Sequence, residues 1–299
     1  MRALITGIAG FTGRYLAEEL AGAGYKVFGL VRREPSSSLP FVSRVFVCDL
    51  LDPAQLRVVV ETVQPDVVVH LAAISFLAHK DVEAIYRTNL LGTRHLFEAL
   101  LPMSSSLKTV LLASSANIYG NAKGGALDEM TPPAPANDYA ISKLAMEYVA
   151  RLYVDRLPMV IVRPFNYTGR GQAEHFLIPK IVAHARRRAA FIELGNLNIA
   201  RDFSDVRMVV HCYRRLLETP AAIGGTFNVC SGKAYTLQDI LFMARNISGY
   251  DMEVRVNPAL VRENEVKILL GDRTRLESVI GQLKDIPLDE TLRWMIEDE

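Results

Sequence analysis

Cysteine is scarce in this chain of 299 residues, which contains only Cys48, Cys212 and Cys230. Their spacing matches neither a disulfide framework nor a metal site, and an odd, sparse set of thiols is typical of a reducing compartment. The six histidines do not cluster as ligands either, so we expect no metal. Because no signal-peptide pattern precedes the first apolar run, we expect a cytoplasmic protein.

An excess of charge of one sign and a long hydrophobic run are also missing. The 34 basic and 33 acidic residues leave a net charge of +1, so we expect neither nucleic acid nor an anionic membrane as the main partner. No apolar stretch approaches the roughly 20 residues that cross a bilayer. One local basic run exists, "ARRRAA" at 185–190, and it indicates either a solvated helix end or a position near an anionic ligand.

Short, nearly continuous apolar runs alternate with helical patterns through the first 165 residues. Such runs are typical of parallel strands buried on both faces, and the alternation predicts an α/β fold with a doubly wound parallel Rossmann sheet. The expected strands are 2–6, 26–31, 44–50, 66–73, 109–115 and 159–165.

After about residue 166 the alternation ends, and isolated strands are expected at 191–195, 225–232 and 253–258. We therefore expect two domains. The first is the Rossmann domain, 1–165, with a returning segment near 200–224. The second is a smaller C-terminal α/β substrate domain, 166–299, built over the strand ends of the first.

A glycine-rich segment, "TGIAGFTG", joins the first strand to the first helix. One glycine permits the tight turn, another permits close approach to a pyrophosphate, and the third lets helix and strand pack closely. The free N–H groups of the helix then face the phosphates. This context predicts dinucleotide binding. The expected contacts are Gly7, Ala9, Gly10, Phe11, Thr12 and Gly13.

The second strand ends in Arg32 and Arg33, where an NAD site usually has an acidic residue. A guanidinium fits the 2′-phosphate of NADP, so we expect NADP(H). The alternative is two surface arginines, with Glu34 reaching an NAD ribose. Further cofactor contacts are expected from the ends of the third, fourth and sixth strands, while His70 is expected to be a packed residue. These contacts are Asp49, Leu50, Leu71, Ala72, Ala73 and Arg163.

The segment "YAISK" places Tyr139 and Lys143 four residues apart in a helical pattern, so both side chains lie on one helix face. A nearby ammonium favours the phenolate and is expected to lower the tyrosine pKa. Tyr139 can then give a proton to a carbonyl oxygen, and Ser115, at the end of the preceding strand, can hold the same oxygen. Both Tyr139 and Lys143 are also expected to contact the cofactor.

In these motifs the chain resembles the extended short-chain dehydrogenase/reductase family. The segments "TGIAGFTG", "HLAA", "NLLGT", "SSANIYG", "YAISK" and "RPFN" occur in family order along the whole length. The resemblance implies Ser115, Tyr139 and Lys143 as the catalytic set. It also implies Asn89 as a structural helper, although Asn89 alone reads as an ordinary polar helix residue.

The residues after Ser115 separate branches of this family. Sugar-nucleotide 4,6-dehydratases look similar, but they carry a glutamate acid/base where this chain has Ala116 and Asn117. Neither of these side chains exchanges a proton at neutral pH, so dehydration is not expected. The pattern instead favours simple hydride transfer to or from a carbonyl.

Three further segments, "VRPFNYTGRGQ", "LGNLNIARDFSDV" and "GGTFNVCSG", look most like the GDP-4-keto-6-deoxy-D-mannose reductases, which form GDP-D-rhamnose. Tyr167 and Arg170 stand where those reductases usually have His and Pro. Other readings stay open: a 4-ketoreductase of another nucleotide sugar (a GDP-6-deoxytalose or dTDP-sugar type), an NAD-retaining nucleotide-sugar epimerase, or a non-catalytic NADP sensor.

A nucleotide-sugar substrate, with GDP favoured, is expected to contact residues of both domains. Asn166, Arg201 and Arg262 suit the pyrophosphate, Glu265 the ribose hydroxyls, and Lys180 the base or phosphates. The arginines alternatively form surface ion pairs, and Phe176 is either a ligand wall or core. Four further contacts are expected before and after the fifth strand, namely Ser75, Ser115, Ala116 and Asn117.

The resemblance also implies a homodimer through a four-helix bundle formed by the helices near 82–100 and 138–156. Both segments are amphipathic with additional apolar residues. This composition suits a second buried face, or equally packing against the sheet.

Overall fold

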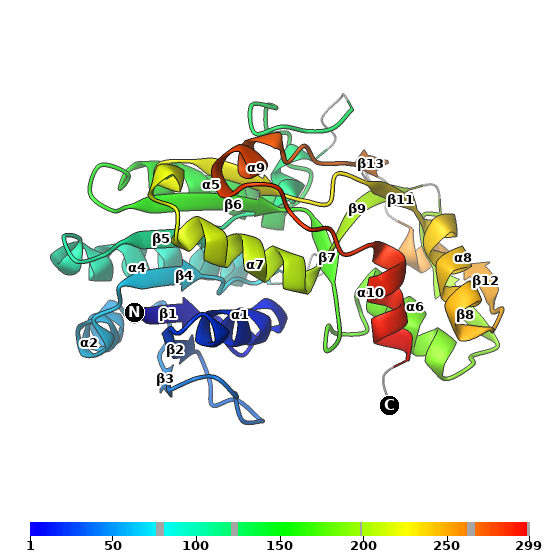
Figure 1. The fold of residues 1–299 in the computed structure, drawn as a ribbon, viewed down its shortest axis with the longest axis horizontal. Coiled ribbons are helices and arrows are strands. Elements are labelled where there is room, and N and C mark those ends of the chain that lie inside the picture. Colours follow the sequence, from blue (N-terminus) through cyan, green and yellow to red (C-terminus); the bar gives the residue numbers. More distant parts are fainter. Residues whose placement is uncertain (76–80, 121–124, 198, 262–266, 298–299) are drawn as a thin grey trace.

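The computed structural model describes residues 1–75, 81–120, 125–197, 199–261 and 267–297. Seven parallel strands form the large sheet in the order β10-β6-β5-β4-β1-β2-β3 (Figure 1). All six strands expected in the first 165 residues lie in it, which confirms the doubly wound parallel sheet. They are β1 (Arg2–Thr6), β2 (Lys26–Val31), β3 (Arg44–Val47), β4 (Val67–His70), β5 (Thr109–Ala113) and β6 (Met159–Pro164).

Helices cover both faces of this sheet, because its central strands are apolar on both sides. One face carries α1 (Phe11–Gly22), α7 (Val206–Leu217) and α9 (Thr274–Ile280). The other carries α2 (Pro53–Val63), α4 (Gly92–Leu100) and α5 (Asp138–Arg151). Leu16 and Leu20, one turn apart on α1, are fully buried, and each contributes about 1.5–3 kcal/mol to folding.

A smaller unit lies beside the large sheet and contains the C-terminal helix (Figure 1). Its four-stranded sheet centres on β9 (Ala200–Asp205), which pairs with β7 (Asn166–Thr168), β11 (Ala234–Thr236) and β13 (Ile268–Leu269). A separate pair is β8 (Phe191–Leu194) with β12 (Glu253–Val256). Three helices enclose a second apolar core, namely α6 (Leu177–Arg186), α8 (Leu237–Ser248) and α10 (Leu288–Ile296).

One expected strand lies in a different unit from the one predicted. The segment 225–232 forms β10 (Thr226–Val229), which pairs in parallel with β6 at the edge of the large sheet. The preceding helix α7 packs on the large sheet and returns the chain to its edge, where Phe227 and Val229 are buried. The division into domains at residue 166 stays a prediction.

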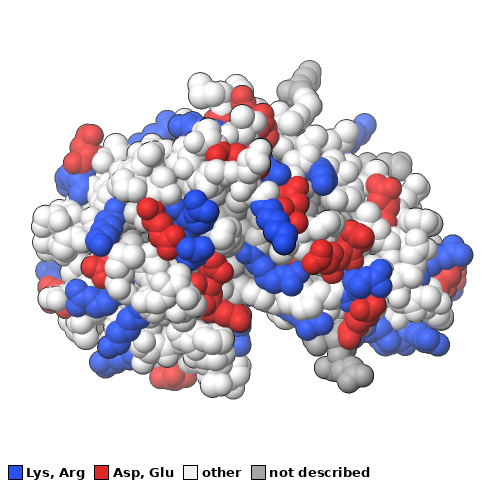
Figure 2. Space-filling model, in the orientation of Figure 1, with Lys and Arg blue, Asp and Glu red and all other residues white. Residues whose placement is uncertain are grey.

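Basic and acidic side chains are interspersed over the face drawn in Figure 2. Within the described ranges, no helix is long and apolar enough to span a membrane. The same ranges contain no group of three or more His, Cys, Asp or Glu residues arranged to hold a metal ion. All three cysteines are free and buried.

Candidate active site

The glycine segment forms a tight loop at the point where the strand order reverses, between β1 and β4. Gly7 adopts φ 72°, and its N–H donates to the carbonyl of Leu30 on β2 (3.0 Å). A Cβ on Gly7 would lie 2.9 Å from Ala72 Cα, and a Cβ on Gly13 would lie 2.6 Å from the carbonyl of Gly7. Side chains at these two positions would therefore collide with backbone.

This loop fits a dinucleotide pyrophosphate. Gly10 occupies the N-cap position of α1 and supplies no side-chain cap, and the first turn of the helix contains no acidic residue. The partial positive charge of the helix N-terminus is therefore open to an anion, at the carboxyl end of parallel strands where dinucleotides bind. The predicted contacts at the end of β4 lie next to the loop, since Ala72 donates its N–H to the hydroxyl of Thr6 (3.2 Å).

His70 is a packed residue, as the sequence indicated. Its two ring nitrogens are hydrogen-bonded to the hydroxyls of Thr6 (2.7 Å) and Thr93 (2.8 Å). Burial lowers the pKa of His70 to about 3, with the nearby Lys143 charge acting in the same direction. The imidazole is therefore neutral at physiological pH and does not serve as an acid.

The residues proposed to hold the adenosine end lie at the ends of β2 and β3. Arg32 and Arg33 are exposed after β2, and neither forms an ion pair with the described part of the chain. Asp49 is exposed, and its carboxylate accepts a hydrogen bond from the N–H of Leu51 (2.9 Å). Leu50 is buried against α4, where a Cβ on Gly92 would lie 2.9 Å from it.

The three catalytic candidates are carried by the end of β5 and the start of α5. Ser115 follows β5, and its Oγ accepts hydrogen bonds from the backbone N–H and the side-chain amide of Asn117 (both 3.1 Å). The side chain of Asn137 caps α5 by accepting from Ala140 N–H (2.9 Å), which places Tyr139 in the first turn. One turn later, the Lys143 ammonium donates to the carbonyl of Ala113, the last residue of β5 (2.7 Å).

Burial changes the acidity of the Tyr139 and Lys143 side chains on α5. It raises the pKa of Tyr139 to about 12, with the hydrogen bond to Ser115 opposing the rise. It lowers the pKa of Lys143 to about 8, with the negative charge of Glu147 opposing the fall. The expectation of a lowered tyrosine pKa was therefore wrong for this structure. The Lys143 ammonium faces a backbone carbonyl, and desolvation dominates at Tyr139.

Asn89 connects the loop after β4 to the first turn of α5. It is fully buried in a π-helical turn, η1 (Arg87–Leu91), that lies between α3 (Val82–Tyr86) and α4. Its amide accepts from the N–H of Ile74 (2.8 Å) and donates to the carbonyl of Ile74 (3.1 Å) and to the hydroxyl of Ser142 (3.0 Å). The Ser142 hydroxyl in turn donates to the carbonyl of Tyr139 (2.7 Å).

The Arg163 side chain is held by protein groups, and its role as a cofactor contact stays a prediction. It is buried on β6, where its guanidinium donates to both carboxylate oxygens of Glu147 (3.0 and 2.8 Å). It also donates to the Tyr119 hydroxyl (2.9 Å) and to the carbonyl of Glu129 (3.1 Å). These bonds use most of the donors of Arg163, which thereby joins α5 to the segment after Ser115.

The predicted substrate residues are spread over both units. Ser75 is exposed after β4, whereas Ala116 is buried beside Ser115. Asn166, on β7, donates to the carbonyl of Asp202 (3.4 Å), and Arg201, on β9, donates to the carbonyls of Ala200 (2.9 Å) and Lys267 (3.3 Å). Arg262 and Glu265 lie outside the described residues.

The remaining substrate candidates belong to α6. Phe176 occupies the N-cap position without a side-chain cap, and its ring centroid lies 4.3 Å from that of His175. Lys180 donates to the carbonyl of Glu193 on β8. The basic run 185–190 ends the helix, where exposed Arg187 pairs with Glu174 (3.5 Å). This pair is consistent with a solvated helix end.

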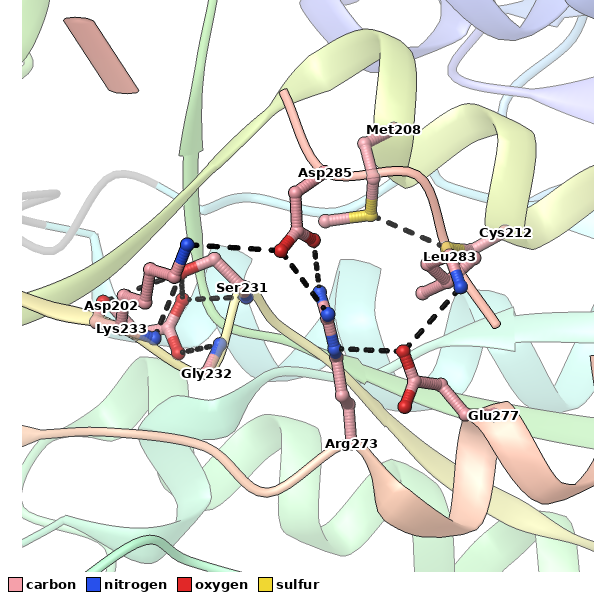
Figure 3. A network of polar contacts seen from close by, with 10 residues as sticks. All are labelled: Asp202, Met208, Cys212, Ser231, Gly232, Lys233, Arg273, Glu277, Leu283 and Asp285. Atoms are coloured by element: carbon pink, nitrogen blue, oxygen red, sulfur yellow. Dashed lines mark hydrogen bonds and ion pairs between the residues drawn. The ribbon is translucent and has the colours of Figure 1, made fainter. Parts of the chain in front are cut away.

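The buried carboxylate of Asp202 was not predicted to matter. It accepts from the N–H (2.8 Å) and hydroxyl (2.7 Å) of Ser231 and from the N–H groups of Gly232 (2.9 Å) and Gly271 (3.3 Å). Figure 3 shows Asp202 with Ser231 and Gly232. Beside them, Arg273 lies between Asp285 and Glu277. Asp202 thereby ties β9, which carries Arg201, to the loop after β10. The only sequence signal that could have pointed to Asp202 is its position next to Arg201.

Tyr167 and Arg170, which stand where the reductases usually have His and Pro, form contacts with α1 and α10. The Tyr167 hydroxyl is hydrogen-bonded to that of Thr12 (2.8 Å), and its ring stacks on Phe11 with centroids 6.1 Å apart. Arg170 accepts from the Tyr15 hydroxyl through its carbonyl (2.8 Å) and donates to the carbonyl of Trp294 (2.7 Å). This segment therefore links the glycine-loop helix to the C-terminal helix.

Known proteins match along nearly the whole chain. The family model of GDP-mannose 4,6 dehydratase matches residues 4–295. A GDP-6-deoxy-D-talose 4-dehydrogenase from Aggregatibacter actinomycetemcomitans is 33% identical over 94% of this chain and 92% of its own length. A GDP-6-deoxy-D-mannose reductase from Pseudomonas aeruginosa is 32% identical over 99% of this chain and 96% of its own length.

Solved structures agree in fold. A crystal structure from Burkholderia cenocepacia, described as that of a candidate epimerase, has a TM-score of 0.93 and 51% identity, covering 99% of this chain and 97% of that one. RMD from Pseudomonas aeruginosa, complexed with NADPH, has a TM-score of 0.83 and 29% identity over 99% and 97%. The chain therefore belongs to the GDP-mannose 4,6-dehydratase family of extended short-chain dehydrogenases/reductases, and it is an NAD(P)-dependent oxidoreductase of sugar nucleotides.

Proposed function

We propose that this protein is an NADPH-dependent reductase of the C4 keto group of a GDP-linked 4-keto-6-deoxyhexose, converting GDP-4-keto-6-deoxy-D-mannose to GDP-D-rhamnose. The observation that carries the proposal is the set Ser115, Tyr139 and Lys143 with no acidic side chain directly after the serine. Ala116 is buried there, and the Asn117 amide is occupied with the Ser115 oxygen. Such a set supports proton and hydride transfer but supplies no carboxylate for removing water.

The protonation states suit a reduction. NADPH, when bound, supplies the hydride. Tyr139, with its pKa raised to about 12, keeps its proton at neutral pH and can donate it to the carbonyl oxygen. Because Ser115 Oγ already accepts two N–H groups of Asn117, its own hydroxyl proton is directed elsewhere and can orient the same oxygen. Lys143 supplies positive charge one helical turn away.

The cofactor preference rests on Arg32 and Arg33 at the exposed end of β2. A charge-assisted bond to a 2′-phosphate contributes roughly 1.5–3 kcal/mol, or about tenfold or more in affinity. The NADPH complex of the Pseudomonas aeruginosa relative, 29% identical to this chain, is consistent with this choice.

The protein is proposed to act as a cytoplasmic homodimer. Exposed apolar side chains lie along η1 and α5 and just after α5, namely Leu91, Ile141, Tyr148 and Leu152. Packing these helices against those of a second copy would remove this surface from water. Residues 166–299 are proposed to supply most of the contacts to the nucleotide sugar.

The test is the rate of NADPH consumption with GDP-4-keto-6-deoxy-D-mannose, beside an NADH control. We expect rapid NADPH oxidation with stoichiometric reduced sugar, and a loss of at least about 100-fold in Tyr139→Phe because the proton donor is removed. Tyr148→Phe is the matched control, since it removes the hydroxyl of an exposed tyrosine on the same helix and keeps the ring that the proposed dimer face uses. A near-normal rate in Tyr139→Phe would contradict the proposed role.

A second candidate is an NAD-retaining nucleotide-sugar epimerase. It is favoured by the 51% identity to the Burkholderia structure described as a candidate epimerase. The same three residues would serve, with Glu34 at the NAD ribose. Identification of tightly bound NAD in the purified protein, together with sugar inversion without net NADPH consumption, would support it over the reductase.

A further inference from the structure

We propose that Arg14 is a third arginine for the adenosine 2′-phosphate, acting with Arg32 and Arg33 to select NADP over NAD. The proposal rests on the NADP preference proposed above and names a specificity residue for that same site. Arg14 lies in the opening turns of α1, directly after Gly13. Neither the glycine pattern nor the end of β2 pointed to it.

Two hydrogen bonds hold the Arg14 guanidinium between two loops. Nε donates to the carbonyl of Ala9 in the glycine loop (3.1 Å). Nη2 donates to the hydroxyl of Ser37 in the loop that follows β2 (3.0 Å). The head group is therefore directed to the β2 side of the glycine loop and is not free to extend along α1.

The positions of β1 and β2 bring the other two arginines to the same edge. The strands pair with Thr6 opposite Leu30, and Gly7 N–H donates to the Leu30 carbonyl (3.0 Å). Arg32 and Arg33 begin two residues later, and Ser37 follows on the same loop. In a dinucleotide-binding fold the adenosine ribose lies at this end of the second strand, so its 2′-position faces the segment that Arg14 contacts.

The charge of Arg14 is not explained by the helix itself. A cation near a helix N-terminus is unfavourable, because the terminus already carries partial positive charge. Arg14 forms no ion pair with the described part of the chain, and its two hydrogen bonds leave further donors free. Arg14, Arg32 and Arg33 carry three positive charges and Glu34 carries one negative charge. The local net charge is therefore +2, which balances a phosphate dianion.

A purely structural role makes a different prediction. If Arg14 only braced Ala9 and Ser37, its loss would weaken NAD and NADP equally. If it contacts the phosphate, its loss weakens only ligands that carry a 2′-phosphate. The difference between these ligands can be measured by binding alone, without any sugar substrate.

The experiment is isothermal titration of the full-length protein with NADP⁺, NAD⁺, 2′,5′-ADP and 5′-AMP. For Arg14→Ala we expect Kd for NADP⁺ and 2′,5′-ADP to rise about tenfold or more, with Kd for NAD⁺ and 5′-AMP changed less than about twofold. Arg14→Lys should retain part of the preference for NADP⁺, since lysine keeps the positive charge but lacks the planar guanidinium that can donate two parallel hydrogen bonds. Arg57→Ala, which removes an exposed arginine of α2, is the matched control and should match the wild type.

Two failures can be told apart. A wild type that prefers NADP⁺, with an Arg14→Ala variant that weakens all four ligands equally or none, overturns the role of Arg14 and leaves the cofactor proposal intact. A wild type that binds NADP⁺ no more tightly than NAD⁺ overturns both. Thermal melting of each variant verifies that the glycine loop has not unfolded.

Discussion

Among His70, Tyr139 and Lys143, the pKa of Lys143 lies nearest to physiological pH. Its ammonium is buried, donates to the Ala113 carbonyl, and has a pKa lowered to about 8. Tyr139, with a pKa raised to about 12, stays protonated far above that pH. The charge state of the pair in the working range is therefore set by the lysine.

The reductase rate is predicted to fall as pH rises through about 8. Below this value Lys143 is charged, and above it the ammonium loses its proton, so the positive charge beside Tyr139 disappears. Steady-state kcat/KM from pH 6 to 10 measures the fall. In Lys143→Arg, whose guanidinium stays charged over this range, the residual activity should lack the fall near pH 8. If kcat/KM of Lys143→Arg fell with the same midpoint, the titrating group would be a residue other than Lys143.

At the scale of elements, α5 is positioned by three polar contacts. Asn137 caps it, Asn89 of η1 reaches it through Ser142, and Glu147 pairs with Arg163 of β6. These are buried or half-buried polar contacts whose partners would otherwise stay unsatisfied. The helix that carries Tyr139 and Lys143 is thus fixed at both its first and third turns.

Asn89→Ala is predicted to lower the free energy of unfolding by about 1–3 kcal/mol and to lower kcat. The change leaves the backbone N–H and carbonyl of Ile74 without their buried partners and frees Ser142 from the π-helical turn. Urea unfolding and steady-state rates measure the two effects.

The control for this prediction lies in the same turn. Arg87 is exposed and forms a surface pair with Glu83 at 3.6 Å, so Arg87→Ala should change stability by less than about 1 kcal/mol. Equal losses in both variants would mean that η1 responds to any substitution and that Asn89 has no particular positioning role.

At the scale of the whole molecule, apolar surface remains on two separate units. Leu152, next to the end of α5, is 67% exposed, and Phe242, on α8 of the smaller unit, is 63% exposed. Only the first belongs to the face proposed to pair with a second copy. The two residues therefore allow a matched comparison of similar side chains.

Leu152→Glu is predicted to shift the protein from twice the chain mass to the single-chain mass of 33.2 kDa. A buried carboxylate at a subunit interface is strongly unfavourable, whereas one on a solvated face has little effect. Light scattering after size exclusion measures the mass, with Phe242→Glu as the control that should stay dimeric. A monomeric wild type, or a dimer that survives Leu152→Glu, would refute the proposed interface.

The sequence by itself determined six of the seven strands of the large sheet, the glycine loop and the spacing of Tyr139 and Lys143. These features follow from local periodicity: continuous apolar runs define strands buried on both faces, glycines mark positions where a Cβ collides, and a four-residue spacing places two side chains on one helix face. Each strand, the glycine loop and the four-residue spacing can therefore be recognised from a short stretch of neighbouring residues.

Only the tertiary structure decided the partners of these residues. Thr12 meets Tyr167 and Asn89 meets Ser142 across long stretches of chain, and β10 joins the large sheet because α7 returns it there. Arg163 pairs with Glu147 inside the core, which no local pattern indicates. Burial reversed the expected shift of the Tyr139 pKa, because desolvation depends on everything packed around a group and not on its neighbours in sequence.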